Sequence, residues 1–403
     1  MRTNFPETLL ATDAGRRANE ILRSCVHCGF CNATCPTYQL TGDELDGPRG
    51  RIYLIRDLLE EEADAKRTTM HLDRCLTCRA CETTCPSGVA YGELAEIARN
   101  TIGTKRKGLK GLLRTFVQWL VPDASRLRLM SRLGALVRPM IPHRLRKHVP
   151  KKIGQGTKPN DVHGRKVLLL DGCAQQVSSG STNSHLVTLL DAAGVGVLLT
   201  PHEGCCGALD LHLGDESKAV ERVKANIDAI YPYLEDCEAI ISTASGCGVT
   251  VKDYGRLLAG DPVYAEKAIA VTEATQDVVE YVASLQEDFV KRPDIDKVAW
   301  HPPCSLQHGM QITGAVESLL TKVGYELVPV KDQHLCCGSA GTYSILQPRM
   351  SNALGDRKMD ALLAHHPDVI ATANVGCESH LAHRTGTPVL HWLELLERRS
   401  VLD

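Results

Sequence analysis

Aromatic residues, long apolar runs and an excess of charge of one sign are all scarce in this sequence of 403 residues. Aromatic residues make up 4%, which argues against a nucleic-acid surface built on base stacking. No run approaches the roughly 18 apolar residues of a membrane span, and the N-terminal residues lack the apolar centre of a signal peptide. The formal net charge of -2 favours no class of partner. We therefore expect a cytoplasmic protein that binds no nucleic acid.

The sequence also lacks the short motifs that mark nucleotide cofactors and hydrolytic zinc sites. It contains no P-loop, no H-E-x-x-H, and no G-x-G-x-x-G after a strand-like run. The stretch AAGVGVLL, at residues 192–199, has two of the three glycines and lacks the third. Any redox centre in this chain must therefore receive its electrons from another subunit that carries a flavin or a nicotinamide.

Cysteine, in contrast, occurs 17 times. The number is odd, and the chain is far too long to resemble a small domain held together by disulfides. In a cytosolic protein such thiols stay reduced, and we expect them to bind metal. The length also exceeds the size at which a single hydrophobic core stops growing, so we expect more than one domain.

Two four-cysteine runs with identical spacing stand out near the N-terminus. Each run reads C-x2-C-x2-C-x3-C and is followed by a proline, Pro36 or Pro86. This is the bacterial ferredoxin pattern, in which three cysteines hold one [4Fe–4S] cluster and the fourth reaches the other cluster. The proline prevents the run from continuing as a helix and directs the fourth thiol away. We therefore predict one cluster held by Cys25, Cys28, Cys31 and Cys85, and a second held by Cys75, Cys78, Cys81 and Cys35.

Structural zinc sites are the alternative for these runs, because C-x2-C is also half of a zinc site. Zinc sites usually join two such halves across a longer loop, so two identical four-cysteine runs favour iron–sulfur clusters. Between the runs, residues 47–74 predict a helix with Ile52 and Ile55 on one face. Arg49 and Arg51, at its start, either offset the charge of a cluster or are solvated in the first helical turn.

Residues 105–152 form a basic segment with fourteen Lys or Arg and a single acid, Asp123. Two apolar stripes recur in it at helical spacing: Leu112, Leu113, Phe116, Trp119 and Leu120, then Leu127, Met130, Leu133 and Leu136. Cationic helices with an apolar stripe and a tryptophan are typical of segments that lie on a membrane surface. A linker that docks on this protein or on a partner subunit explains the pattern equally well, so both interpretations stay open.

From about residue 162 the sequence contains a duplication. Short β-rich runs alternate with helical stretches, and each copy contains one CCG motif. The cysteine spacings of the two copies agree. Cys173 to Cys205 and Cys304 to Cys336 are both 32 positions, and Cys206 to Cys247 is 41 positions where Cys337 to Cys377 is 40. Such agreement identifies a repeated domain. The alternation of strands and helices predicts a mostly parallel sheet covered by helices in each copy.

The matched cysteines of each copy follow apolar, strand-like runs. Ligands of parallel sheets lie beyond the carboxyl ends of the strands, so four thiols from distant parts of each copy can converge at one edge. We predict metal or cluster sites at Cys173, Cys205, Cys206 and Cys247, and at Cys304, Cys336, Cys337 and Cys377. Cys237 has no counterpart and is interpreted as a structural cysteine. His202 and His334 precede the CCG motifs. One interpretation is that they are metal ligands or proton relays, and the other is that they are loop histidines held by hydrogen bonds.

With these motifs the chain resembles the glycolate oxidase iron–sulfur subunits. The resemblance covers nearly the whole chain and rests on two CCG repeats and two runs, SCVHCGFCNATCPTYQLTGDELDGPRGRIYLI and LDRCLTCRACETTCPSGVAYGEL. It implies an electron-transfer subunit that accepts electrons from flavin-containing subunits oxidising glycolate to glyoxylate and passes them toward a quinone-type acceptor. If the basic segment contacts lipid, the protein lies peripherally on the cytoplasmic face of the inner membrane.

The sequence departs from the fuller cysteine-rich pattern, which ends in C-x-x-C. Ala244 and Asn374 stand at the first position of that pair, so each copy has four thiols instead of five. This departure counts against the non-cubane clusters and disulfide chemistry of heterodisulfide reductases, and it leaves a conventional cluster, zinc or a quinone pocket open. The alternative functions are an iron–sulfur subunit of a lactate or glycerol-3-phosphate dehydrogenase, a thiol/disulfide enzyme, and a zinc-bearing assembly scaffold.

The sequence as a whole predicts an α+β multidomain protein. The expected parts are a helical ferredoxin-like module with two [4Fe–4S] clusters at 1–104, a basic amphipathic linker at 105–161, and two α/β CCG repeats at 162–290 and 291–403. No catalytic residue is predicted in this chain, because the flavin site is expected on a partner.

Overall fold

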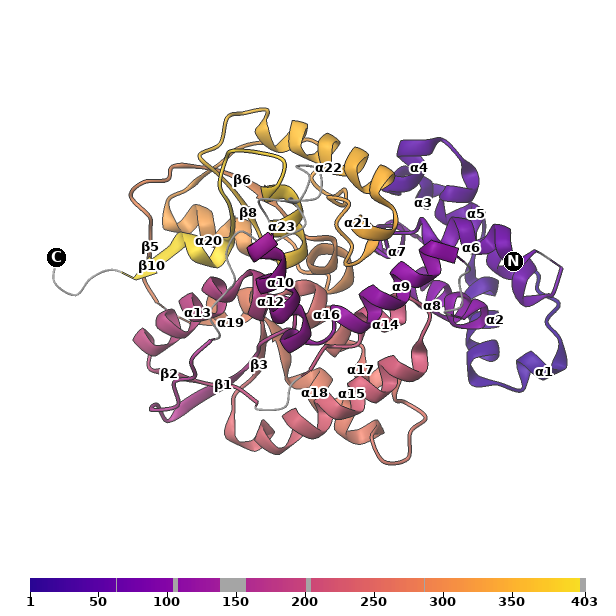
Figure 1. Cartoon of the computed structure of the whole chain (residues 1–403), viewed down its shortest axis with the longest axis horizontal. Helices are drawn as coiled ribbons and strands as arrows, with labels where there is room; N and C mark the ends of the chain where they lie inside the picture. The colour runs from indigo at the N-terminus through magenta and orange to yellow at the C-terminus, as the bar shows by residue number, and fades with distance from the viewer. Residues whose placement is uncertain (63, 104–107, 138–156, 201–203, 286, 399–403) are drawn as a thin grey trace.

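The structure, a computed structural model, describes the chain except for residues 63, 104–107, 138–156, 201–203, 286 and 399–403. Figure 1 shows the N-terminal helices packed against one end of a larger body that consists of two α/β halves. The predicted fold class is confirmed, because a helical region is followed by two repeats with parallel sheets. The predicted divisions after residues 104, 161 and 290 stay predictions.

Short helices build the N-terminal region, because the cysteine runs and several prolines interrupt it. They are α1 (Glu7–Leu10), α2 (Asp13–Ser24), α3 (Phe30–Ala33), α4 (Pro36–Thr41), η1 (Glu44–Asp46), α5 (Pro48–Leu59), α6 (Ala65–Asp73), α7 (Ala80–Thr83) and α8 (Tyr91–Ile102). Pro36 and Pro48 occupy the first turns of their helices, where no backbone N–H is needed. Leu22, Ile55 and Leu94 are fully buried at the centre of this region.

The helix predicted over residues 47–74 is two helices in the structure, α5 and α6. Glu61 lies between them with a φ of 60°, a left-handed conformation that ends a helix. Asp64 then begins α6, because its carboxylate accepts a hydrogen bond from the Lys66 amide. The prediction of one helix was therefore wrong: apolar periodicity does not reveal a polar turn between two helices that bury the same side.

Two helices, α9 (Gly108–Leu120) and α10 (Ala124–Val137), lead from the N-terminal region to the repeats. One side of α9 packs on the protein, where the buried Gln118 donates from Nε2 to the carboxylates of Asp210, at 2.8 Å, and Asp215, at 2.9 Å. The other side is exposed and apolar, with Leu109, Leu112, Leu113, Phe116 and Trp119. The predicted apolar stripe of α9 is therefore mostly exposed, and its contact with a membrane or a partner subunit stays a prediction.

The second apolar stripe of the basic segment lies on α10. Of its predicted members, Met130 and Leu133 are exposed, and so is the neighbouring Leu129. Most of the remaining basic residues, at 138–152, lie outside the described residues. Within the described ranges, no helix combines the length and the apolar character needed to cross a membrane.

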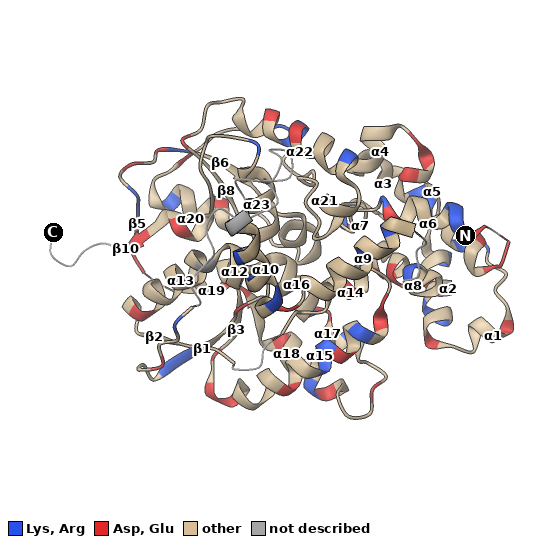
Figure 2. Ribbon diagram, in the orientation of Figure 1, with Lys and Arg blue, Asp and Glu red and all other residues tan. Residues whose placement is uncertain are grey.

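A four-stranded parallel sheet forms the first repeat, with the strand order β2-β1-β3-β4. Its strands are β1 (Arg165–Leu170), β2 (Val195–Leu198), β3 (Ile240–Ser242) and β4 (Thr275–Asp277). Its helices are α12 (Gln175–Ser178), α13 (Gly180–Ala192), α14 (Ala208–His212), α15 (Glu216–Ile230), η3 (Tyr231–Asp236), α16 (Ser245–Lys252), α17 (Tyr254–Leu257), α18 (Ala265–Ala274) and α19 (Val278–Ser284). Acidic and basic residues alternate along the outer helices such as α15 (Figure 2).

The second repeat has the same sheet topology, with the parallel order β7-β6-β8-β9. Its strands are β6 (Lys297–His301), β7 (Glu326–Leu327), β8 (Val369–Thr372) and β9 (Val389–His391). Its helical elements are η4 (Ser305–Gly309), α20 (Ala315–Val323), α21 (Tyr343–Leu346), α22 (Pro348–Leu363), α23 (Val375–Ala382) and η5 (Trp392–Leu395). An antiparallel pair, β5 (Phe289–Lys291) and β10 (Leu396–Arg398), lies beside it. The duplication is confirmed, because corresponding strands hold corresponding places.

The two repeats share one hydrophobic core. Leu169 and Ile241 of the first sheet belong to the same buried cluster as Trp300 and Val369 of the second sheet. Burial of apolar surface between the sheets therefore holds the repeats together. In each sheet, the cysteines follow the carboxyl ends of the strands, so this core also positions the thiols.

Candidate functional site

The first cysteine cavity lies in the N-terminal region, beside α2, α3 and α5. It has a volume of about 30 Å³, and its lining includes all four thiols predicted for the first cluster: Cys25, Cys28, Cys31 and Cys85. Cys85 belongs to the second run, so the fold crosses the two runs in the ferredoxin manner. The structure therefore brings the first predicted set together.

A second cavity of about 20 Å³ is lined by the other predicted set: Cys35, Cys75, Cys78 and Cys81. Here Cys35 is the residue that crosses over from the first run. Cys81 lines both cavities, so the two sites are direct neighbours. All seventeen cysteines lie in the described part of the chain, and none of them forms a disulfide.

The two runs share an unusual local backbone. His27 and Thr77, two residues after the first cysteine of each run, have φ values of 56° and 54°, and Gly29 and Arg79, two residues further on, have 83° and 60°. Residues in the left-handed region turn the chain sharply. Two such turns within one run allow its first three thiols to line one cavity. At Gly29, a Cβ atom would lie 2.5 Å from Arg49 Nη1, the end of a flexible side chain that can move, and the equivalent turn of the second run is made by Arg79.

Two buried cations, Arg51 and Arg99, lie next to the second cavity. Arg51 is 1% exposed, donates from Nε to the His71 carbonyl at 2.9 Å, and places Nη1 4.0 Å from Cys35 Sγ. Arg99 donates to the Cys75 carbonyl at 3.1 Å. Burial raises the pKa of the Cys75 thiol. The positive charges of Arg51 and then Arg99 lower that pKa by more than burial raises it, so the net shift in pKa is downward. The thiolate, which is the metal-binding form, is therefore favoured at Cys75.

The arginines differ in how well the sequence predicted their role. Arg51 offsets thiolate charge from a buried position, as one of the two interpretations held. Arg49 lines the first cavity, but its side chain is 36% exposed and pairs with Glu44 at 2.6 Å. Arg99 was not predicted, because it lies in α8, beyond the ferredoxin pattern, and nothing in its local sequence distinguishes it from a surface arginine.

The four matched thiols of the first repeat form a chain of neighbours. Side-chain hydrogen bonds join Cys173 to Cys205, Cys205 to Cys206, and Cys206 to Cys247. These thiols follow β1, β2 and β3, as predicted from the position of each strand. Hydrogen bonds with Cys205 and Cys247, together with burial, raise the pKa of Cys206. His202, the predicted neighbour of this site, lies outside the described residues.

The second repeat brings its four thiols together in the same way. Cys304 Sγ lies 3.9 Å from Cys336 Sγ, and side-chain hydrogen bonds continue from Cys336 to Cys337 and from Cys337 to Cys377. Cys336, Cys337 and Cys377 are buried. The hydrogen bond with Cys336 lowers the pKa of Cys337, but the hydrogen bond with Cys377 and burial raise it, and the net shift in pKa is well upward.

The second repeat also touches the second ferredoxin cavity. Cys78 packs with Cys304 and Cys336 in one small apolar cluster, which Leu76 and Tyr343 complete. Burial raises the pKa of Cys78, and the next contribution in the same direction comes from Cys304. Thiols of the ferredoxin region and of the second repeat are therefore in one continuous group, which no sequence spacing revealed.

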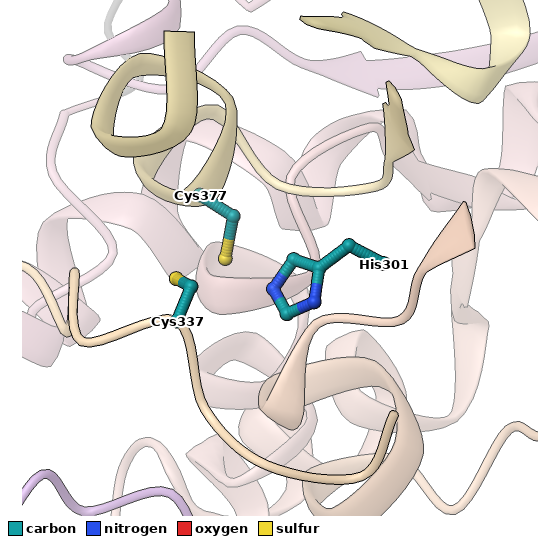
Figure 3. A group of neighbouring side chains, drawn as sticks. All are labelled: His301, Cys337 and Cys377. Atoms are coloured by element: carbon teal, nitrogen blue, oxygen red, sulfur yellow. The ribbon is translucent and has the colours of Figure 1, made fainter. Parts of the chain in front are cut away.

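A histidine that the sequence analysis did not single out joins this group. His301, at the end of β6, lies with Cys337 and Cys377 so that one ligand atom of each residue is within 4.8 Å of the others. Figure 3 shows the His301 ring and both sulfur atoms directed at a common space. The signal was present in KVAWHPPC, where His301 precedes Cys304 by three residues. A single histidine in a strand-like run was not sufficient to distinguish it.

Two other residues discussed from the sequence lie elsewhere. His334 lines a separate cavity beside Trp300 and Gln307, and its carbonyl accepts hydrogen bonds from Gln307 and His308. Cys237 is partly buried and packs against the core of the first repeat.

A larger cavity, of about 210 Å³, lies where the N-terminal region, α9 and both repeats meet. Its wall includes Cys75 of the second cysteine run, Arg99 of α8, Leu113 of α9, His212 of α14 and Tyr343 of α21. Leu113 belongs to the exposed apolar side of α9, so that side continues into the cavity. The cavity therefore offers apolar and basic groups next to a cysteine of the second ferredoxin site.

Comparison with known proteins adds two domain families. The family described as a 4Fe-4S dicluster domain matches residues 21–89. The family described as a cysteine-rich domain, CCG, matches residues 167–252 and again 298–382. Iron–sulfur binding is thus supported by the family that covers both cysteine runs.

Individual proteins match over most of the chain. The glycolate oxidase iron-sulfur subunit of Escherichia coli is 45% identical over 405 aligned residues, which cover 99% of each chain. A probable glycolate oxidase iron-sulfur subunit of Bacillus subtilis is 33% identical, over 88% of this chain and 87% of its own length. A solved structure of a hypothetical protein from Helicobacter pylori has a TM-score of 0.55 at 10% identity, covering 95% of this chain and 72% of that protein, and shows similarity of fold.

Proposed function

We propose that this chain, which belongs to the family of glycolate oxidase iron–sulfur subunits, carries electrons from glycolate oxidation on a partner subunit toward a quinone-type acceptor. Family membership follows from 45% identity to a relative of that name over nearly the entire length. The observation that carries the proposal is the pair of adjoining cavities, one lined by five cysteines and the other by four, with both runs contributing to each. That arrangement suits two iron–sulfur clusters at close distance.

The proposed ligands are the two sets of cysteines that line the cavities. Cys25, Cys28, Cys31 and Cys85 hold one [4Fe–4S] cluster, and Cys75, Cys78, Cys81 and Cys35 hold the other. When bound, such clusters supply one-electron transfer. The protein contributes the cysteine ligands, two buried arginines beside the second set of thiols, and walls that exclude water. Oxidation of glycolate to glyoxylate releases two electrons and two protons, so electrons arrive in pairs and can be passed on singly.

Electrons are proposed to enter at the first site. Cys28 is exposed, and the neighbouring Val26 and Phe30 are 68% and 62% exposed. Large apolar side chains at this exposure are typical of surfaces that bind another protein. We propose that the flavin-containing partner docks over Val26 and Phe30, which places its flavin next to the first cluster.

Electrons are proposed to leave from the second site. Cys75 lines the cavity of about 210 Å³, and Arg99, His212 and Tyr343 supply polar groups there. A quinone head group has two carbonyl oxygens on an apolar ring, and it takes up two electrons and two protons to become a quinol. Polar groups on an apolar wall suit such a ring, and the second cluster would be its electron donor.

The exposed side of α9 and α10 is proposed to rest on a membrane surface, from which a lipophilic quinone can reach this cavity. Leu109, Phe116 and Trp119 form the apolar side of α9, and Arg126, Arg128 and Arg132 lie on α10. Apolar side chains together with basic ones attract a helix to anionic lipid. The thiols of the two CCG repeats are proposed to bind metal or a further cluster.

Glycolate-driven reduction of the chain tests the proposal. The anaerobically purified chain is mixed with the flavin-containing subunits and glycolate, and the visible absorbance of the clusters is followed. We expect bleaching with glycolate, and strongly slowed bleaching in a Val26→Lys, Phe30→Glu variant that still carries iron and is still reduced by dithionite. The control is Val263→Lys, which changes a 64% exposed valine on the first repeat. Absence of glycolate-driven bleaching in the intact complex would contradict the proposed function.

A further inference from the structure

His301 is a buried histidine whose ring nitrogens have no hydrogen-bond partner among the described residues. It is 1% exposed, and both Nδ1 and Nε2 are buried without a partner. Buried polar atoms are nearly always satisfied in folded proteins, so an imidazole with both nitrogens unsatisfied indicates a missing partner. The ring faces the sulfur atoms of Cys337 and Cys377 (Figure 3), and one ligand atom from each residue lies within 4.8 Å of the others.

The first repeat has no equivalent of this histidine. His301 is the last residue of β6 and precedes Cys304 by three positions, and Leu170 is the last residue of β1 and precedes Cys173 by three positions. β1 and β6 hold the same place in their sheets. The thiols of the two repeats therefore correspond, but only the second repeat adds an imidazole to them.

We propose that the second repeat binds a single zinc ion through His301, Cys337 and Cys377, and that the first repeat lacks this mixed site. Thiolate and imidazole are the ligands that Zn²⁺ prefers, and its sites are tetrahedral. Three protein ligands leave one coordination position. Cys336, whose thiol is hydrogen-bonded to that of Cys337, is a candidate for the fourth ligand. On binding, the cysteine thiols release their protons and the histidine binds in its neutral form.

The charges around the site suit this metal. Zinc with two thiolates and a neutral imidazole has no net charge, and a third thiolate from Cys336 would leave one negative charge. Lys358 is buried at 3% exposure, where its Nζ donates to the carbonyls of Asp332 and Gln333. The thiols of Cys336, Cys337 and Cys377 all act electrostatically on this lysine. A buried ammonium group next to the site therefore offsets the remaining thiolate charge, as burial of charge requires.

The zinc ion would join three elements that are distant in sequence. His301 ends β6, Cys337 lies in the CCG loop, and Cys377 lies in α23. The same loop carries Cys336, which packs against Cys78 of the second ferredoxin site. The inferred role of zinc is thus to fix the surface on which the second repeat meets that site, which is distinct from transferring electrons.

Metal analysis of the whole chain, purified anaerobically, tests this inference. We expect about one zinc per chain in addition to the iron, and an X-ray absorption spectrum at the zinc edge with both nitrogen and sulfur neighbours. His301→Leu, which copies the residue of the first repeat, should weaken apparent zinc affinity by about tenfold or more. His301→Cys supplies a different zinc ligand and should retain the metal. Cys237→Ser, a thiol outside the matched sets, should retain zinc fully.

Iron content and dithionite reduction, measured on the same samples, show whether each variant is folded, and they test the proposed electron transfer independently of zinc. Substitution with Co²⁺ gives a second readout, because the visible absorption of the cobalt form should change in His301→Leu. Three results would overturn the inference: absence of zinc from the folded wild type, an all-sulfur zinc shell, and full zinc retention by folded His301→Leu. Additional iron that depends on His301 would also overturn it, because a cluster would then occupy the site.

Discussion

Replacing Arg51 by methionine should make the second cluster harder to reduce. The guanidinium group is 1% exposed and approaches Cys35 Sγ to 4.0 Å, so water screens it poorly from the thiols of this site. An added electron is spread over the cluster, so we place its centre about 7 Å from the charge and use an effective dielectric constant of about 20. The lost attraction is then about 2 kcal/mol.

For a one-electron couple, about 1.4 kcal/mol corresponds to about 59 mV. The potential of the second cluster should therefore fall by roughly 100 mV in Arg51→Met. The fold should tolerate the change, because Asp46 keeps its contacts with His71 at 2.7 Å and with Arg74 at 2.9 Å. The assay is a redox titration of the anaerobic protein, followed by EPR of each reduced cluster.

Two further variants make this prediction specific. Arg51→Lys keeps the charge and should recover most of the potential. Arg49→Gln removes a side chain that is 36% exposed, and it should shift the first cluster much less because solvent screens that charge. An unchanged potential in Arg51→Met, or an equal change in both clusters, would refute the electrostatic role assigned to Arg51.

Three more predictions follow from the structure. Cys35→Ser should damage the cluster anchored by the second cysteine run more than the cluster anchored by its own run, and EPR showing loss of the first cluster alone would reject the crossed ligation. Neutralising three arginines of α10, namely Arg126, Arg128 and Arg132, should release the complex from anionic vesicles. Binding of the wild-type complex to these vesicles should weaken as the salt concentration rises. Salt-insensitive binding would favour docking on a partner protein instead. Burial raises the pKa of Glu378 from 4.5 to about 8. Between these pH values the native state keeps a proton on Glu378 that the unfolded chain has lost. The free energy of unfolding should therefore decrease as pH rises through this range. Glu378→Gln should remove that part of the pH dependence in thermal unfolding, and an unaltered profile would contradict the raised pKa.

The sequence predicted what depends on local spacing. The C-x2-C-x2-C-x3-C runs indicated which thiols would share a cavity, because the ferredoxin pattern contains its own crossing rule, and Cys85 and Cys35 do cross. The repeated CCG spacing predicted two similar sheets, and these have corresponding strand orders. In both cases a short chain segment determines the arrangement.

The sequence did not predict what depends on packing between distant segments. Cys78 meets Cys304 and Cys336 only because the N-terminal region docks on the second repeat. His301 becomes a candidate ligand because β6 ends beside α23, and Arg99 reaches Cys75 from a helix that carries no cysteine. A single histidine or arginine has no spacing that marks it, so its partners are visible only in the folded chain.

Iron and acid-labile sulfide analysis of the anaerobically purified chain, combined with EPR after dithionite reduction, tests the central claim most directly. If the two cysteine cavities hold [4Fe–4S] clusters, the ferredoxin region should contain about eight irons and a matching amount of sulfide, with two interacting reduced clusters. A chain that contains zinc in these cavities, with no iron and no sulfide, would contradict the account.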